Sequence, residues 1–146
     1  MKKTIIIILA VAIVAGLAVL GYQNFKLANI PVPVVVTPQT GLIVDAPLAN
    51  GLVASPLVVS GHVDGTDYWT GFEGQVGSVT LFDGNGNTLT QKPLTATTDW
   101  MQLPTSFSTT LIFSTPTTSV GTLVFKNENP SGMLEREKQF ILPVKF

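Results

Sequence analysis

Two adjacent aromatic residues offer the clearest chemistry in this chain of 146 residues. Tyr68 and Trp69 stand in a glycine-rich stretch that also carries Asp64 and Asp67. Exposed rings in a loop can stack on a sugar ring or a peptide, while buried rings close the end of a hydrophobic core. Glu73 follows shortly after and could accept hydrogen bonds from the backbone amides of a neighbouring loop. We predict a candidate ligand or partner site at Tyr68, Trp69 and Glu73, and both roles for the rings stay open.

A single histidine limits the enzymatic possibilities. His62 could complete a Ser-His-Asp set, because the chain holds many serines and several aspartates. However, no Gly-x-Ser-x-Gly turn is present to display a nucleophilic serine. His62 also falls on the polar face of a predicted strand, with no evident partner to orient it as a base. We expect a surface histidine and no catalytic residue.

The acidic residues of the glycine-rich loop suggest a second type of catalysis. Asp64, Asp67 and Glu73 are close enough in sequence to suggest the carboxylate pair of a glycoside hydrolase. The domain is small for a substrate cleft, so we expect no such activity.

A metal or cofactor site is not expected. Asp83 to Asn87 reads Asp-Gly-Asn-Gly-Asn and imitates the start of a calcium loop. Thr88 takes the place of the glycine that such a loop needs next, and the distant glutamate is missing. A hairpin turn explains the segment. With no cysteine and one histidine, the chain has neither a disulfide framework nor a zinc-ligand set.

The N-terminus contains a long apolar run. Residues 5–20 are uncharged and apolar, and they follow Lys2 and Lys3. As a helix this run would span about 24 Å, which is short for a membrane anchor but long for the core of a signal peptide. The best cleavage site, before Tyr22, is mediocre. We expect residues 1–28 to form a membrane anchor, or alternatively a cleaved signal, and the remainder to lie outside the cytoplasm.

A proline-rich segment and a weakly acidic domain follow. Residues 29–40 carry Pro31, Pro33 and Pro38, which disfavour helix and predict a semi-rigid stalk. Beyond residue 28 the chain has nine acidic and five basic residues, a net charge of 5 − 9 = −4. No cluster of lysine or arginine is present, so nucleic acid is not expected as a partner.

Residues 41–146 show alternation of apolar and polar residues with period two, which is typical of half-buried strands. Leu123 and Phe125, for example, alternate with Thr122, Val124 and Lys126, and we expect both to be buried. About seven strands are predicted, near residues 42–45, 57–63, 76–82, 88–91, 106–113, 120–127 and 138–146. Pro143 places the last strand at a sheet edge. This pattern predicts an all-β domain, an immunoglobulin-like antiparallel β-sandwich.

Four short phrases stand in a characteristic order along this domain. They are Ser55 to Gly61 (Ser-Pro-Leu-Val-Val-Ser-Gly), Phe72-Glu73-Gly74, Asp99-Trp100-Met101 and Asn129-Pro130-Ser131-Gly132. With them the chain, from about residue 42 to residue 146, resembles Gmad2, the immunoglobulin-like domain named from bacterial spore germination proteins. The resemblance implies a non-catalytic β-sandwich on the outer side of a bacterial membrane that mediates binding or adhesion. Germination proteins often carry a further sporulation-associated domain, which we do not expect in this chain, so a role in germination is not expected either.

The same phrases have structural interpretations. Gly61, on an inward face, would let a large neighbour such as tryptophan pack closely. Trp100 and Met101 would plug one end of the sandwich. A rigid turn is expected between the last two strands, formed by Asn129, Pro130, Ser131 and Gly132.

These observations favour a non-catalytic, exported interaction or structural module at the bacterial cell envelope, whose partner is an unknown protein or glycan. The alternative is a carbohydrate-binding module for cell-wall or extracellular polysaccharide that uses Tyr68 and Trp69.

Overall fold

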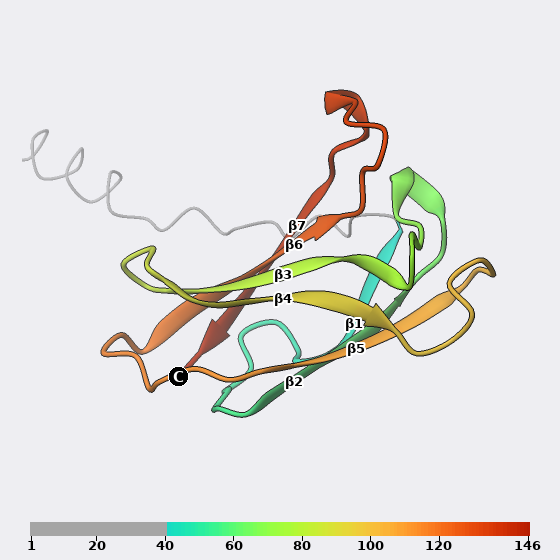
Figure 1. The fold of residues 1–146 in the computed structure, drawn as a ribbon. Helices are drawn as coiled ribbons and strands as arrows, with labels where there is room; N and C mark the ends of the chain where they lie inside the picture. Colours follow the sequence, from blue (N-terminus) through green and yellow to red (C-terminus); the bar gives the residue numbers. More distant parts are fainter. Residues whose placement is uncertain (1–40) are drawn as a thin grey trace, which may run out of the picture. The chain divides into compact units, whose positions relative to one another are not determined.

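A computed structural model describes residues 41–146, which form seven β-strands (Figure 1). The strands are β1 (Leu42–Ala46), β2 (Leu57–Val63), β3 (Gln75–Asp83), β4 (Thr88–Ala96), β5 (Thr105–Leu111), β6 (Val120–Asn127) and β7 (Gln139–Lys145). Two short 3-10 turns, η1 (Thr66–Tyr68) and η2 (Leu134–Arg136), lie in connections. The predicted anchor (residues 1–28) and stalk (residues 29–40) lie outside the described residues. From residue 41 onward, no helix has the length and apolar content needed to cross a membrane.

The predicted strands are confirmed, and six of them match closely. The exception is β4, which the alternation pattern ended near residue 91 but which continues to Ala96. Pro93 argues against a strand because it lacks a backbone N–H. It is accommodated opposite Ser78, where the register of β3 shifts after Gln75.

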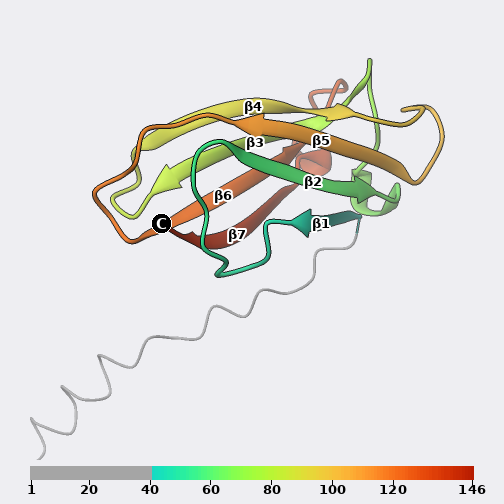
Figure 2. The ribbon, with the colours of Figure 1, turned by 90° about the horizontal axis from the view of Figure 1, so that it is seen from below.

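All named strand pairs are antiparallel, and the strand order is β1-β2-β5-β4-β3-β6-β7. Figure 2 shows β1, β2 and β5 facing β3, β6 and β7, with β4 at the bend between them. The link between β4 and β5 is short, with two residue pairs, Thr95 with Ser108 and Ala96 with Phe107. Hydrogen bonding is therefore continuous through β4, so the two predicted sheets are one sheet folded over a shared core.

The core follows the period-two pattern. Leu123 and Phe125 of β6 are fully buried, as expected, and the Phe125 ring packs against Phe140 with 5.8 Å between the ring centroids. The buried apolar residues are Leu42, Val53, Leu57, Val59, Val63, Trp69, Val76, Val79, Leu81, Leu94, Phe107, Leu111, Leu123, Phe125, Leu142 and Val144. Every strand contributes to this one core, which orients the connecting loops.

Strand β7 lies at the sheet edge, which confirms the expectation from Pro143. This edge is partly covered by the connection between β1 and β2. The backbone N–H of Asn50 donates to the Pro143 carbonyl (2.7 Å), and Val53 N–H donates to the Lys145 carbonyl (2.8 Å). Lys145 N–H donates in return to the Gly51 carbonyl (2.9 Å). Because the N and C=O of one strand residue point to the same side, Pro143 turns its missing donor away from β6.

Candidate functional site

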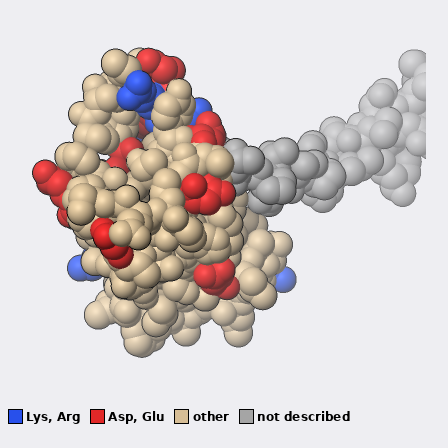
Figure 3. Space-filling model, turned by 90° about the vertical axis from the view of Figure 1, so that its right-hand side faces the viewer, with Lys and Arg blue, Asp and Glu red and all other residues tan. Residues whose placement is uncertain are grey.

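The charged residues of the domain gather at one end of the sheet. Three connections meet there, residues 64–74, 97–104 and 128–138, and we call them the acidic end. They carry seven of the nine acidic residues of the chain but only two basic ones, Arg136 and Lys138. Figure 3 views this end: acidic side chains are spread over its surface, and basic ones are seen near the top and also at the left and right margins.

Tyr68 occupies an exposed position in this end and is held by two cations. Its side chain is 48% exposed. The Arg136 guanidinium and the Lys138 ammonium each lie 5.5 Å from the centre of the Tyr68 ring. Lys138 also pairs with Asp67, with 3.0 Å between Nζ and Oδ1. Such contacts stabilise one orientation of the ring.

One amide side chain joins the two connections that surround Tyr68. Asn127, the last residue of β6, donates from Nδ2 to the backbone carbonyls of Tyr68 and Arg136, both at 2.9 Å. Its Oδ1 accepts from the backbone N–H of Lys138 (2.8 Å). The alternation pattern gave no signal for this role, because it depends on contacts across 59 and 9 residues of sequence.

The turn predicted at Asn129 to Gly132 is confirmed. Gly132 N–H donates to the Asn129 carbonyl (3.0 Å), and Gly132 has φ 67°, a value that glycine adopts without strain. Asn129 Nδ2 donates to the Met133 carbonyl (2.8 Å), and Ser131 Oγ donates to Asn129 Oδ1 (2.7 Å). These bonds fix the shape of the turn.

Tyr68 and this turn border one concave site, which we call the loop-end pocket. Its volume is about 190 Å³. It is lined by Gly65, Tyr68, Thr70, Glu128, Asn129, Pro130, Ser131 and Arg136. The structure thus brings together two predicted elements that are some 60 residues apart in sequence, the aromatic loop and the Asn-Pro-Ser-Gly turn. The lining offers one aromatic ring, one cation, one carboxylate and several hydroxyl and amide groups.

The two other predicted binding residues do not line this pocket. Trp69 is fully buried, so its ring acts as a core plug and offers no face to a ligand. Glu73 has φ 49° and lies with Gly74 in a tight turn closed by Phe72 and Gln75. Its carboxylate accepts no hydrogen bond within residues 41–146, so the expected contact with a neighbouring loop is not seen there.

The remaining structural predictions have mixed outcomes. Gly61 faces inward as expected, but the large neighbour is Phe107, whose Cζ would lie 2.8 Å from an added Cβ. Trp100 packs edge-on against Phe72, with 6.5 Å between centroids. Met101 is 73% exposed, so its expected plugging role is wrong. The connection between β4 and β5 directs Met101 into solvent.

His62 and Asp45 lie near each other on the outer face of the sheet. Their closest atoms, Nδ1 and Oδ2, are 3.9 Å apart, and His62 is paired across the strands with Ser106. No hydrogen bond joins the three side chains in the described structure, and Asp45 is 62% exposed.

Two of the three loop carboxylates, those of Asp64 and Asp67, are engaged in contacts within the described structure. Asp64 Oδ1 accepts from the backbone N–H of Thr66 (2.8 Å) and from its hydroxyl (2.7 Å). These bonds lower the pKa of Asp64, and the bond from the Thr66 backbone is the largest cause. Asp67 pairs with Lys138, and Glu73 lies at the turn described above.

The calcium-like segment at the other end of the sheet is a turn. Asp83 Oδ1 accepts from the backbone N–H groups of Asn85 (2.9 Å) and Asn87 (2.8 Å), and Oδ2 accepts from Asn87 Nδ2 (2.9 Å). The Asn87 side chain is the main cause of a lowered pKa at Asp83. Within residues 41–146 no group of three acidic or histidine side chains is placed to hold a metal ion.

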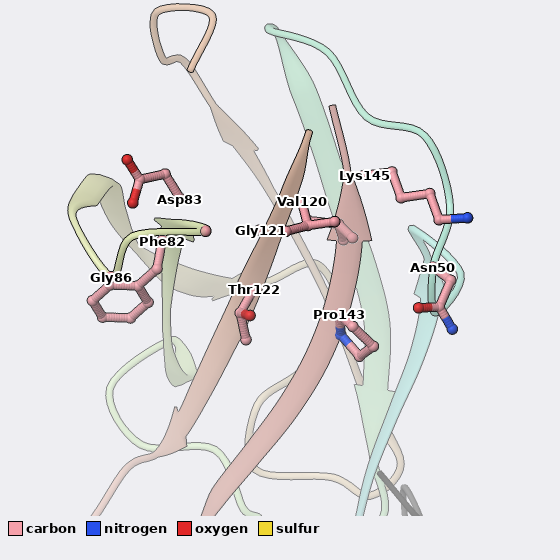
Figure 4. A pocket seen from close by; sticks show the side chains of 11 residues that line it. Asn50, Phe82, Asp83, Gly86, Val120, Gly121, Thr122, Pro143 and Lys145 are labelled. Atoms are coloured by element: carbon pink, nitrogen blue, oxygen red, sulfur yellow. The ribbon is translucent and has the colours of Figure 1, made fainter. Parts of the chain in front are cut away.

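A larger groove of about 530 Å³ runs along the outer face of β3, β6 and β7 beside this turn (Figure 4). Phe82 and Asp83 form one side, and Pro143, Lys145 and Asn50 the other. Thr122 and Val120 lie between them. The groove is open and offers one carboxylate and one ammonium at its margins. The Asp83 carboxylate already accepts hydrogen bonds from Asn85 and Asn87 of its own turn.

Comparison with known protein families gives a match over most of the described domain. A family model described as the immunoglobulin-like domain of bacterial spore germination, Gmad2, matches residues 42–133. The match covers β1 to β6 and the Asn129 turn and stops before β7. Searches of curated proteins and of solved structures found no match to the chain.

Proposed function

The chain belongs to the Gmad2 family of immunoglobulin-like domains, and from this premise we propose that it is a non-catalytic interaction module displayed at the bacterial cell envelope. Export is supported by the sequence of the N-terminus, where Lys2 and Lys3 precede the apolar run of residues 5–20. The domain would be held at the membrane by this run and would present its loops to a partner.

The loop-end pocket is the observation that carries the binding role. Tyr68 is exposed, yet its ring is fixed by Arg136 and Lys138 and its backbone by Asn127. Rigid aromatic side chains make effective binding residues because little conformational entropy is lost on contact.

Site-specific crosslinking tests this role. A photoreactive phenylalanine analogue would replace Tyr68 in the full-length chain, and Ile43 on the outer sheet face would serve as the control position. Illumination of intact cells should give a discrete adduct from position 68 and none from position 43. Adducts from both positions, or from neither, would contradict a binding role for the pocket.

The tether is tested separately by the intact mass of the protein recovered from the membrane fraction. A full-length mass supports an anchored module whose partner lies within reach of the stalk. A mass that begins near Tyr22 identifies a secreted domain and rejects the tether.

A carbohydrate ligand is the second candidate. The exposed Tyr68 ring beside the polar groups of Asn129 and Ser131 favours it, because sugars bind to an aromatic face bordered by hydrogen-bonding groups. With Trp69 buried, Tyr68 would be the single stacking residue. Retention on a polysaccharide gel that is lost in Tyr68→Ala, and kept in Met101→Ala, would support this ligand; equal migration of all three proteins would reject it.

A further inference from the structure

The end of the sheet opposite the acidic end has loops without any charge. Its connections are residues 47–56, 84–87 and 112–119, and none contains a Lys, Arg, Asp or Glu. We call them the uncharged end; Figure 2 shows them together at the left, near the C-terminal label. Several large aliphatic side chains are exposed there, among them Leu48 (71%), Leu52 (80%) and Ile112 (72%).

A groove of about 490 Å³ opens in this end. We call it the Phe113 groove. It is lined by Leu52, Val53, Ala54, Ser55, Phe113, Ser114, Thr115, Pro116 and Phe146. No charged side chain lines the groove, and two aromatic rings do: Phe113 and Phe146 meet edge to face with 5.9 Å between their centroids.

The two walls of the groove are connected and therefore preformed. One wall comes from the β1–β2 connection and the other from the β5–β6 connection. The backbone N–H of Phe113 donates to Ser55 Oγ (3.0 Å), which joins the walls across 58 residues of sequence. Val53 is bonded to the edge strand β7 through the Lys145 carbonyl, so the first wall is also fixed to the sheet.

The second wall has free hydrogen-bonding groups. Beyond the Phe113 bond, residues 114–117 make no backbone hydrogen bond within the part of the chain described. Ser114 and Thr115 have exposed side chains and belong to no strand. Unpaired backbone donors and acceptors beside an apolar groove are the features that let a protein add an extended peptide by main-chain pairing.

We propose that the Phe113 groove binds an extended, uncharged, apolar segment of another polypeptide. Charge complementarity argues for this partner, because a charged side chain would lose its hydration in a groove that offers no counter-charge. The aromatic rings would contact proline or β-branched side chains, and the backbone of residues 114–117 would pair with that of the peptide. A lipid chain would leave those backbone groups unpaired, so the observations favour a peptide over a membrane surface.

A defined peptide tests the proposal. The probe is the blocked, fluorescently labelled hexapeptide acetyl-Val-Thr-Val-Pro-Val-Thr-amide, and its counterpart has glutamate in place of the central valine. Each is titrated with the purified full-length chain while fluorescence anisotropy is followed. The uncharged peptide should bind with a Kd below about 1 mM, and the glutamate peptide at least about tenfold more weakly.

Matched variants locate the binding. Leu52→Glu and Thr115→Glu place a charge on opposite walls of the groove, and both side chains are exposed, so the fold should be kept. Met101→Glu places the same charge on an exposed side chain at the acidic end. We expect about tenfold weaker binding in the first two variants and a change below about twofold in Met101→Glu. Circular dichroism and thermal unfolding check that all three remain folded.

Three results would overturn the proposal. They are the absence of peptide binding up to millimolar concentration, binding that Leu52→Glu and Thr115→Glu leave unchanged, and equal binding of the glutamate peptide. Retention on phosphatidylcholine vesicles that depends on Leu52, without peptide binding, would assign the groove to a lipid surface instead. Because Tyr68 lies at the opposite end, crosslinking from position 68 succeeds or fails independently of this test.

Discussion

At the residue scale, Tyr68 and Trp69 are neighbours with opposite environments. Tyr68 has φ 63° and is half exposed, whereas Trp69 is extended, with φ −87°, and fully buried. The left-handed backbone at Asp67 and Tyr68 reverses the chain, and this reversal turns one ring to solvent and the next into the core. One aromatic therefore contributes to stability and the other is available for contact.

We predict that Trp69→Ala destabilises the domain by about 3–5 kcal/mol, since it empties a large core site. Tyr68→Ala should cost less than about 1 kcal/mol, because it removes an exposed ring and its cation contacts. Urea unfolding followed by circular dichroism measures both. Similar losses in the two variants would show that the rings are placed wrongly.

The hydrogen bonds around Asp83 predict an acid-sensitive turn. The pKa of Asp83 is lowered from its ordinary value of 3.8, chiefly by the Asn87 side chain. Its stabilising contribution is therefore complete above the unfolded-state pKa and is lost as pH falls through the lower folded-state pKa. Between neutral pH and pH 3, wild type should lose stability more steeply than Asp83→Asn, which cannot titrate there.

Unfolding midpoints in urea at several pH values measure this difference. Asp83→Asn should also be less stable than wild type at neutral pH, because an amide nitrogen would face the donor of Asn87. Asp64, whose pKa is also lowered, remains in the variant and should preserve part of the acid dependence. Parallel curves for the two proteins would reject the role of Asp83.

At the scale of elements, β6 connects the core to the candidate site. Leu123 and Phe125 face inward from its middle, and Asn127 at its end ties the Tyr68 and Arg136 backbones together. β6 is paired along its length with both β3 and β7. The position of the loop-end pocket therefore depends on a strand that is fixed on both sides.

We predict that Phe125→Ala destabilises the domain by about 3–5 kcal/mol, because Phe125 is fully buried and packs on Phe140. With no cysteine in the chain, no disulfide can offset the loss. Val124→Ala, on the outer face of the same strand, is the matched control and should cost far less. A loss below about 1 kcal/mol for Phe125→Ala would contradict the facing of β6.

At the scale of the whole described domain, the two ends differ in chemistry. Antiparallel strands place alternate connections at opposite ends of the sheet, and here the charged loops are all at one end and the uncharged loops at the other. The segment Asn50–Val53 joins the uncharged end to β7 and shields that edge from pairing with other chains. The two candidate sites are thus separated by the length of the sheet and can act independently.

Hydrogen exchange should reveal which backbone amides are protected at the uncharged end. The backbone amides of Val53 and Lys145, which are bonded across the edge, should exchange at least about a thousandfold more slowly than those of Ser114 and Thr115, which have no partner among residues 41–146. Mass spectrometry with fragmentation, or NMR, resolves these sites. Fast exchange at Val53 and Lys145 would show that the edge is open.

Much of the fold could be predicted from sequence because its signals are local. Period-two alternation marked the strands, and Pro143 marked the edge, since the chain itself carries the pattern that one buried face requires. The Asn129 turn was predictable for the same reason, as its bonds span only a few residues. The end of β4 was missed, because the register shift that accommodates Pro93 depends on its partner strand.

The candidate sites required the tertiary structure. Sequence identified Tyr68 and Trp69 as aromatic loop residues, but only the reversal at η1 decided which ring is buried. The sequence also gave no sign that Asn127 joins two loops or that Ser55 and Phe113 belong to one groove. These contacts are between residues far apart in the chain, and their energies depend on how the sheet folds over its core. Alternation determined which strands form; packing decided which side chains the loops offer to a partner.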